Sequence, residues 1–181
     1  MKAINLLTQR QSTPLLTEPK PSKDSLELII DAGMRVPDHA ALKPWFFHVI
    51  TGDGLKKISD LFVSSSIETE GANLEKIAKM PFRAPMIIVV STQYKTHDKV
   101  PLKEQLITAG CCVHAMQMAC VALGYGAMWR TGALAANEKV KEGLGISEQD
   151  EIVGFLYVGT PCKKDRLKPK KTLVDKVTFW Q

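Results

Sequence analysis

Three short segments of this 181-residue chain combine residue types that bind anions or planar rings. The first is Arg10-Gln11-Ser12, which follows a short run of helix-forming residues. An arginine fork beside a hydroxyl suits a phosphate group, because both donate hydrogen bonds and the arginine adds a positive charge. The same residue types also occur at exposed helix ends without a ligand, so this segment alone leaves both interpretations open.

The second segment runs from Met34 to Trp45 and contains Arg35, Asp38, His39 and Lys43 between prolines. The prolines make this stretch a stiff loop that cannot continue the preceding helix. Polar loops held on a rigid scaffold often contain functional residues. The alternative is structural: Asp38 caps a turn and His39 lies on the surface.

The third segment is Trp129-Arg130-Thr131-Gly132, at the end of a short strand that follows a glycine-rich turn. An arginine and a threonine beside a flexible glycine suit a phosphate or a planar ring. In the alternative interpretation Trp129 is a core residue, and Arg130 extends its charged group to solvent along an apolar stem.

Several common catalytic motifs do not occur in the sequence. It contains no GxGxxG, GxxxxGK[ST], HExxH or GxSxG pattern. Its four cysteines form no CxxC pair, so neither a disulfide framework nor a metal site is expected. An enzyme without a protein nucleophile or a metal can take its reactivity from an organic cofactor.

The elements that must position these segments follow from hydrophobic spacing and capping residues. The patterns predict helices at residues 3–8, from a cap at Ser22 or Asp24 to residue 34, at 55–63, in a piece ending near 79, at 103–123, and from Asn137 to 143. Strands are predicted at 45–51, 86–91, 125–130 and 151–158. The loops are too irregular for a βαβ repeat, so we expect an α+β fold with a small mixed sheet flanked by helices.

The stretch Leu106–Leu123 is the most apolar part of the chain and has about the length of a membrane span. It contains Thr108, Gly110, His114 and Gln117, and amphipathic segments surround it, so we interpret it as a core or interface helix without membrane contact. A helix that is apolar nearly all round is hard to bury in one small chain. We therefore expect a homodimer. The N-terminal residues do not form a signal peptide, which indicates a cytoplasmic protein.

The net charge of +5 arises in one segment. Lys163–Lys176 holds seven basic and two acidic side chains, and the remainder of the chain is balanced. A broad nucleic-acid-binding surface is therefore not expected, and any attraction of anions is local. We expect one domain over residues 1–181, with 163–181 as a basic C-terminal tail.

Together and in this order, the segments resemble the nitroreductase superfamily, and within it the branch of small bacterial enzymes. The resemblance runs from Ala3 to about Pro161 and is densest in MRVPDH, PWFFHVI, PFRAPMII, HDKVP, AGCCVHAMQMA, GYGAMWRTGAL and QDEIVGFLYVGTP. It implies an FMN-dependent α+β fold, completed by homodimerisation, with the flavin at the interface between the two chains.

The resemblance also assigns residues. It implies FMN contacts from Arg10, Gln11, Ser12, Arg35, His39, Trp129, Arg130 and Thr131. It implies NAD(P)H contacts from Ala119, Cys120, Val121, Ala122, Leu123 and Gly124. The family usually has a second arginine where this chain has Gln11, and we expect Lys163 or Lys164 of the basic tail to replace that charge.

The implied function is transfer of a hydride from NAD(P)H to N5 of FMN, and of electrons from there to a nitroaromatic, quinone or similar small acceptor. No side chain needs to react covalently, and Arg35 is the expected cation beside the reduced ring. One alternative is a flavin-binding or flavin-free protein of the same fold without NAD(P)H turnover. Another is a small anion- or nucleic-acid-binding module that uses the basic tail.

Overall fold

The computed structural model describes residues 2–163 and 176–181, and its centre is a five-stranded sheet. The strands are β1 (Leu16–Thr17), β2 (Trp45–Thr51), β3 (Met86–Thr92), β4 (Gly126–Arg130) and β5 (Ile152–Pro161). Strand β5 pairs with β3 along one edge, with β4 along the other, and with β1 at its C-terminal end, while β2 pairs with the free edge of β3.

The α+β class is confirmed, but the expectation of a mixed sheet is wrong for these strands. Every strand pair within the described residues is antiparallel. The reason is that β5 runs opposite to all three of its neighbours, and β2 runs opposite to β3. The pairing also includes the two-residue strand β1, which is not among the predicted strands.

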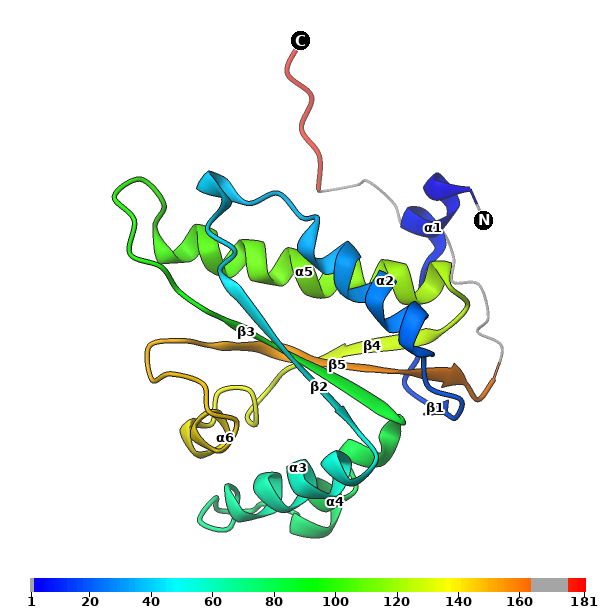
Figure 1. Ribbon diagram of the computed structural model, residues 1–181, viewed down its shortest axis with the longest axis vertical. Helices are drawn as coiled ribbons and strands as arrows, with labels where there is room; N and C mark the ends of the chain where they lie inside the picture. Colours follow the sequence, from blue (N-terminus) through cyan, green and yellow to red (C-terminus); the bar gives the residue numbers. More distant parts are fainter. Residues whose placement is uncertain (1, 164–175) are drawn as a thin grey trace.

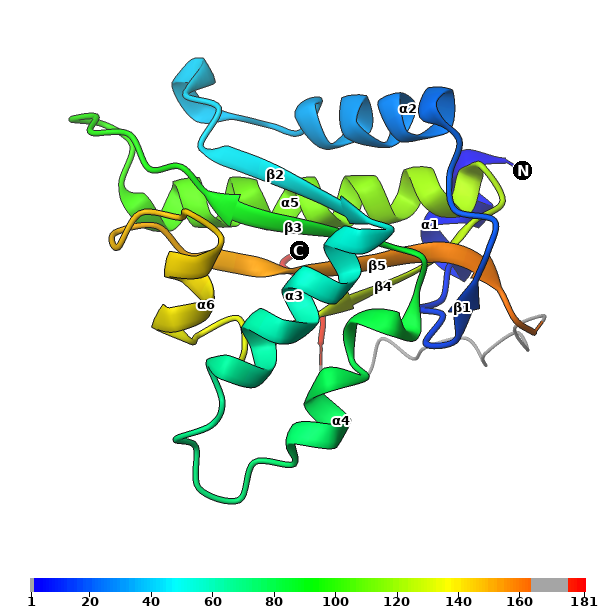
Figure 2. The same cartoon turned by 60° about the horizontal axis from the view of Figure 1, so that its bottom comes forward.

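Helices cover both faces of the sheet (Figure 1). The helices are α1 (Ala3–Gln9), α2 (Lys23–Met34), α3 (Asp53–Ser64), α4 (Leu74–Ala78), α5 (Leu102–Ala122) and α6 (Glu138–Gly143), with short 3-10 turns at His39–Ala41 (η1) and Pro81–Arg83 (η2). Figure 2 shows α2 and α5 on one side of the sheet and α3, α4 and α6 on the other.

Strand β3 separates two apolar cores. All of its residues are buried, as its continuous apolar run predicts. Because successive side chains of a strand point to opposite faces, Ile87 and Val89 join the core under α3 and α6, whereas Ile88 and Val90 join the core under α5. The sheet is therefore buried on both faces at its centre.

Helix α5 confirms the predicted core helix to within one residue at each end. Cys112, Val113, Met116 and Cys120 are fully buried against the sheet and α2. Among the described residues α5 is the one helix with the length and hydropathy of a membrane span, and half of its most apolar window is buried inside the chain. Ile107, on the opposite side, remains 57% exposed.

Local signals mark where helices begin and end. The Ser22 hydroxyl accepts a hydrogen bond from the N–H of Ser25, and the Asn137 side chain accepts one from the N–H of Val140. Gly124 follows Leu123, the C-cap residue of α5, and adopts a φ of +87°, a conformation that favours glycine. The prediction that residues 1–181 form one domain stays a prediction, because 164–175 lie outside the described residues.

Candidate functional site

The first predicted segment lies where α1, α5 and β4 meet. Arg10 follows α1, and its Nη1 donates to the hydroxyl of Ser12 at 3.3 Å. The Ser12 hydroxyl also accepts from Nε2 of Gln117 at 3.4 Å. Gln117 lies on α5, and the same Nε2 donates to the carbonyl of Ala127 on β4 at 3.2 Å. The hydrogen bonds join three elements around the arginine, with Gln11 partly buried beside it.

Sequence reasoning missed the role of Gln117, because it treated this residue only as evidence against a membrane span. The side chain is 3% exposed, and a buried amide needs hydrogen-bond partners. Its position in an otherwise apolar helix was the available signal. What the sequence could not supply was the identity of the partners, which come from segments more than a hundred residues away or across a turn.

The positive charge of Arg10 is not neutralised by any carboxylate among the described residues. Within that part of the chain its one side-chain hydrogen bond goes to the neutral hydroxyl of Ser12. The side chain is partly buried, so the charge is less screened than at the open surface. This arrangement suits a bound anion.

The second predicted segment lies at the other end of α5. Arg35 follows the last residue of α2 and is exposed. His39 begins η1, and its Nδ1 lies 2.9 Å from Oε2 of Glu104 in the first turn of α5. A carboxylate at Nδ1 favours the tautomer with its proton there, which leaves Nε2 free for another partner.

The loop that presents His39 is strained and held in place. Ala40, Ala41 and Lys43 all have φ between +51° and +61°, which is uncommon for residues with a side chain. The backbone N–H of Lys43 donates to Oδ2 of Asp38 at 2.7 Å, as expected of a residue that caps a turn. Asp38 and Glu104 together fix the position of the imidazole.

The side chains of Trp129 and Arg130, in the third predicted segment, point to opposite faces of β4. The indole Nε1 of Trp129 donates to the carbonyl of Val153 at 3.2 Å, and the ring packs in the core under α5. The guanidinium of Arg130 lies on the opposite face of β4, 5.4 Å from the centre of the Tyr157 ring. This alternation is the normal consequence of strand geometry, so the two side chains do not act on one face.

Burial lowers the pKa of Arg130, and the neighbouring charge of Arg83 lowers it further. Its Nε is shielded from solvent and has no hydrogen-bond partner within the described residues. Thr131 is exposed directly after the strand. Any ligand near this segment would therefore meet the ring of Trp129 on one face, or the backbone and Thr131 at the strand end.

The predicted nicotinamide-nucleotide segment forms the end of α5. Cys120 is fully buried, and burial raises the pKa of its thiol to about 12. The N–H of Gly124 donates to the carbonyl of Val121, and that of Tyr125 donates to the carbonyl of Cys120. These bonds satisfy carbonyl groups in the last turn of α5. The helix dipole is negative at this C-terminal end, so it does not favour a bound phosphate. The NAD(P)H contacts stay a prediction, and residues 122–124 are the exposed part of that segment.

The first and second predicted segments, called here the first and second groups, thus lie at separate places along α5. The first group contacts α5 at Gln117, and His39 contacts it at Glu104. The helix rises about 20 Å between these positions. In Figure 1, α1 lies near one end of α5 and the turn at 39–41 near the other. The expected replacement cation at Lys163 is exposed, and the one at Lys164 lies outside the described residues.

The fold and these segments match a known family. The family model described as Nitroreductase family matches residues 7–160, and the chain belongs to the nitroreductase family. The sequence resemblance and the expectation of an enzyme of this class are confirmed.

Two curated relatives cover nearly the whole chain. It is 46% identical over 166 residues to the Escherichia coli (strain K12) protein named "Putative NAD(P)H nitroreductase YdjA", with 91% of each chain covered. It is 36% identical over 167 residues to a Haemophilus influenzae protein named "Putative NAD(P)H nitroreductase", again with 91% of each covered.

Solved structures confirm the fold. The nitroreductase-like family protein from Bacillus cereus superposes with a TM-score of 0.87 at 24% identity, covering 100% of this chain and 97% of the other. A Bacteroides fragilis nitroreductase, whose structure is described as having bound FMN, superposes with a TM-score of 0.76 at 18% identity, covering 100% of both chains.

Proposed function

We propose that this chain is an FMN-dependent NAD(P)H oxidoreductase that reduces nitroaromatics, quinones or similar small acceptors as a homodimer. The observation that carries the proposal is the position of Arg10, which no carboxylate of the described residues neutralises, beside the Ser12 hydroxyl that Gln117 holds between α5 and β4. The names of the relatives, and the FMN described for the Bacteroides fragilis structure, support this assignment.

The residues fit the phosphate end of FMN. A guanidinium and a hydroxyl, both partly buried, provide a charged donor and a neutral donor at one place. Gln117 donates to Ser12, so the hydroxyl proton of Ser12 is left to point toward a ligand. Two ligand-facing donors already in position reduce the entropy lost on binding.

The separation of the two groups along α5 favours a dimer. One copy places Arg10 near the end of α5 and His39 near its start. Two copies related by a two-fold axis, with their α5 helices antiparallel, would bring the first group of one chain beside the second group of the other. The exposed Ile107 on the outer side of α5 would be buried in that interface.

Bound FMN would supply the two-electron chemistry, accepting a hydride from NAD(P)H and passing electrons to the acceptor. The protein would bind and orient it. Arg35 would place a positive charge where negative charge develops on the ring. His39, fixed by Glu104, would present Nε2 to the flavin as a hydrogen-bonding group. Trp129, fixed by its bond to Val153, would form a flat apolar wall.

The test is an absorbance spectrum of the purified protein, recorded before and after addition of NADPH or NADH without oxygen. We expect a yellow protein whose visible absorbance bleaches with one or both reductants and returns when menadione or a nitroaromatic is added. A yellow protein that neither reductant bleaches would identify a flavin-binding protein without turnover. A colourless protein that takes up no added FMN would contradict the proposal.

A further inference from the structure

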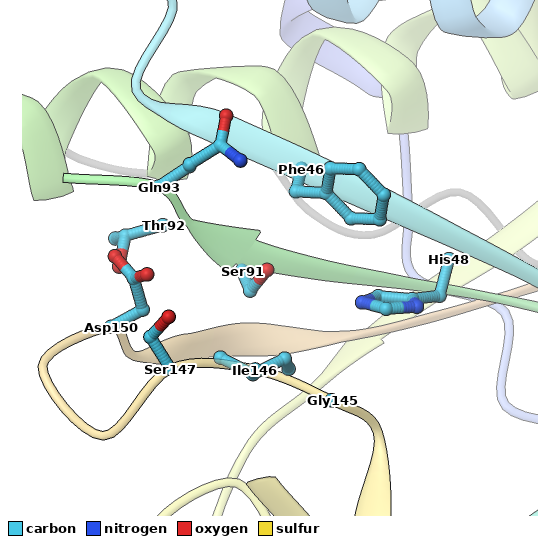
Figure 3. Close-up of a pocket in the computed structure, with 9 residues that line it drawn as sticks. All are labelled: Phe46, His48, Ser91, Thr92, Gln93, Gly145, Ile146, Ser147 and Asp150. Atoms are coloured by element: carbon cyan, nitrogen blue, oxygen red, sulfur yellow. The ribbon is translucent and has the colours of Figure 1, made fainter. Parts of the chain in front are cut away.

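A cavity of about 200 Å³ lies on the face of the sheet that α3 and α6 cover, near the start of the edge strand β2. The loop between α6 and β5 closes it from below (Figure 3). It is lined by Phe46 and His48 of β2, Ser91, Thr92 and Gln93 at the end of β3, and Gly145, Ile146, Ser147 and Asp150 of the loop. None of these residues belongs to the flavin site proposed above.

Asp150 gives the cavity its charge. The residue is 6% exposed, and its Oδ1 accepts from the N–H of Tyr94 at 2.7 Å and from the hydroxyl of Thr92 at 3.2 Å. These two bonds fix the carboxylate. Its Oδ2 has no hydrogen-bond partner, and no cation pairs with the group, in the part of the chain that the structure describes. A cation held close to this carboxylate would be stabilised by its charge, because the partly enclosed cavity screens the interaction less than open solvent does.

The opposite wall is aromatic. The rings of Phe46 and His48 make an edge contact, with their centres 4.9 Å apart at 63°. Nε2 of His48 is shielded from solvent and has no hydrogen-bond partner in residues 2–163 and 176–181. Burial lowers the pKa of this imidazole, so it adds no competing positive charge near neutral pH. Figure 3 shows the ring edge of His48 directed toward Ser91. Phe46 and Ile146 supply apolar surface on either side.

The loop wall is already formed. Gly145 adopts a φ of +70°, and the N–H of Asp150 donates to the carbonyl of Ser147 at 3.0 Å. The ammonium of Lys141 donates to the carbonyl of Glu148 at 2.7 Å, which ties the loop to α6. Because these bonds hold the loop, a ligand would not have to order it on binding.

We propose that this cavity binds a small organic ammonium ion with an aromatic or short apolar group. The ammonium would lie against Asp150 and the Ser147 hydroxyl, and the apolar group against Phe46 and Ile146. The volume is too small for a nucleotide cofactor. The inference does not depend on flavin binding, because the cavity and the proposed flavin contacts share no residue.

The test uses three probes with the same ring: benzylamine, which is cationic at pH 7, benzyl alcohol and benzoate. Each is titrated into the full-length ¹⁵N-labelled protein and followed by amide chemical shifts. We expect benzylamine to shift the amides of Gly145, Ser147 and Asp150, benzyl alcohol to bind at least tenfold more weakly, and benzoate not to bind. Shifts that map to α1 and α5, or equal affinity for benzylamine and benzoate, would overturn the proposal.

Two matched variants separate a specific site from general attraction of cations. Asp150→Asn keeps an acceptor oxygen for Tyr94 and Thr92 but removes the charge, and should weaken benzylamine at least tenfold. Glu148→Gln removes an exposed carboxylate of the same loop and should leave the affinity unchanged. Equal weakening by both contradicts the proposal. If Asp150→Asn does not fold, Phe46→Ala replaces it, with at least threefold weaker benzylamine binding expected and unchanged binding contradicting the site.

Discussion

Single residues decide how the N-terminal segment is placed. Gln117 uses one amide nitrogen to hold both Ser12 and the carbonyl of Ala127, so one side chain connects the end of α1 to β4. Arg10 donates to the same hydroxyl, and its other guanidinium donors have no partner among the residues that the structure describes. The proposed phosphate contact therefore depends on a cation whose neighbours are neutral.

We predict that Arg10→Ala raises the dissociation constant for FMN about tenfold to a hundredfold, because a hydrogen bond to a charged group contributes about 1.5–3 kcal/mol. The measurement is quenching of FMN fluorescence on titration with apoprotein. Lys20→Ala removes the same charge from an exposed position and is the control. An equal loss of affinity in both variants would show that only the overall charge matters.

At the scale of elements, the side chain of Trp129 on β4 packs against both β5 and α5. Gly154 of β5 lies under the indole, where a Cβ atom would come 2.2 Å from Nε1 of Trp129 and 2.8 Å from the carbonyl oxygen of Arg130. Gly110 of α5 faces the same ring with more room, since a Cβ there would lie 3.9 Å from it. The two glycines therefore differ in what they tolerate.

We predict that Gly154→Ala lowers the free energy of unfolding by about 1–3 kcal/mol, because the backbone carbonyl cannot move aside and the indole must leave its hydrogen bond to Val153. Gly110→Ala should instead stabilise by about 0.5–1 kcal/mol, as expected in a helix interior. Urea unfolding measures both changes, and FMN titration should show weaker binding for Gly154→Ala alone. Similar unfolding midpoints for the two variants would contradict the tight packing of Gly154 against the Trp129 ring.

At the scale of the whole molecule, α5 has two roles on its two sides. Its inner side fills the core beneath α2, and its outer side leaves Ile107 exposed between the two groups of predicted flavin contacts. The proposed dimer explains both the exposed apolar side chain and the distance between the groups. A monomer would leave each group as half of a site.

We predict that Ile107→Glu converts a dimer into a monomer and removes FMN binding, because two carboxylates would be buried against an apolar interface. Ile67→Glu introduces the same charge at a residue that is 64% exposed but lies after α3, on the other layer, and should leave the dimer intact. Light scattering coupled to size-exclusion chromatography measures the mass. A dimeric Ile107→Glu variant that still binds FMN would exclude α5 from the interface.

The sequence by itself determined the features that depend on neighbours along the chain. The caps at Ser22 and Asn137 and the strand at 86–91 are local signals, and all three predictions are confirmed. The similarity of several collinear segments likewise indicated the family without any coordinates.

Only the tertiary structure decided which distant residues meet. Strand pairing made the sheet antiparallel, and alternation along β4 sent Trp129 and Arg130 to opposite faces. The partners of Gln117 and the cavity around Asp150 come from segments far apart in the chain. Such contacts depend on strand order, register and burial, because side-chain direction in space is set by the packed elements and not by residue type.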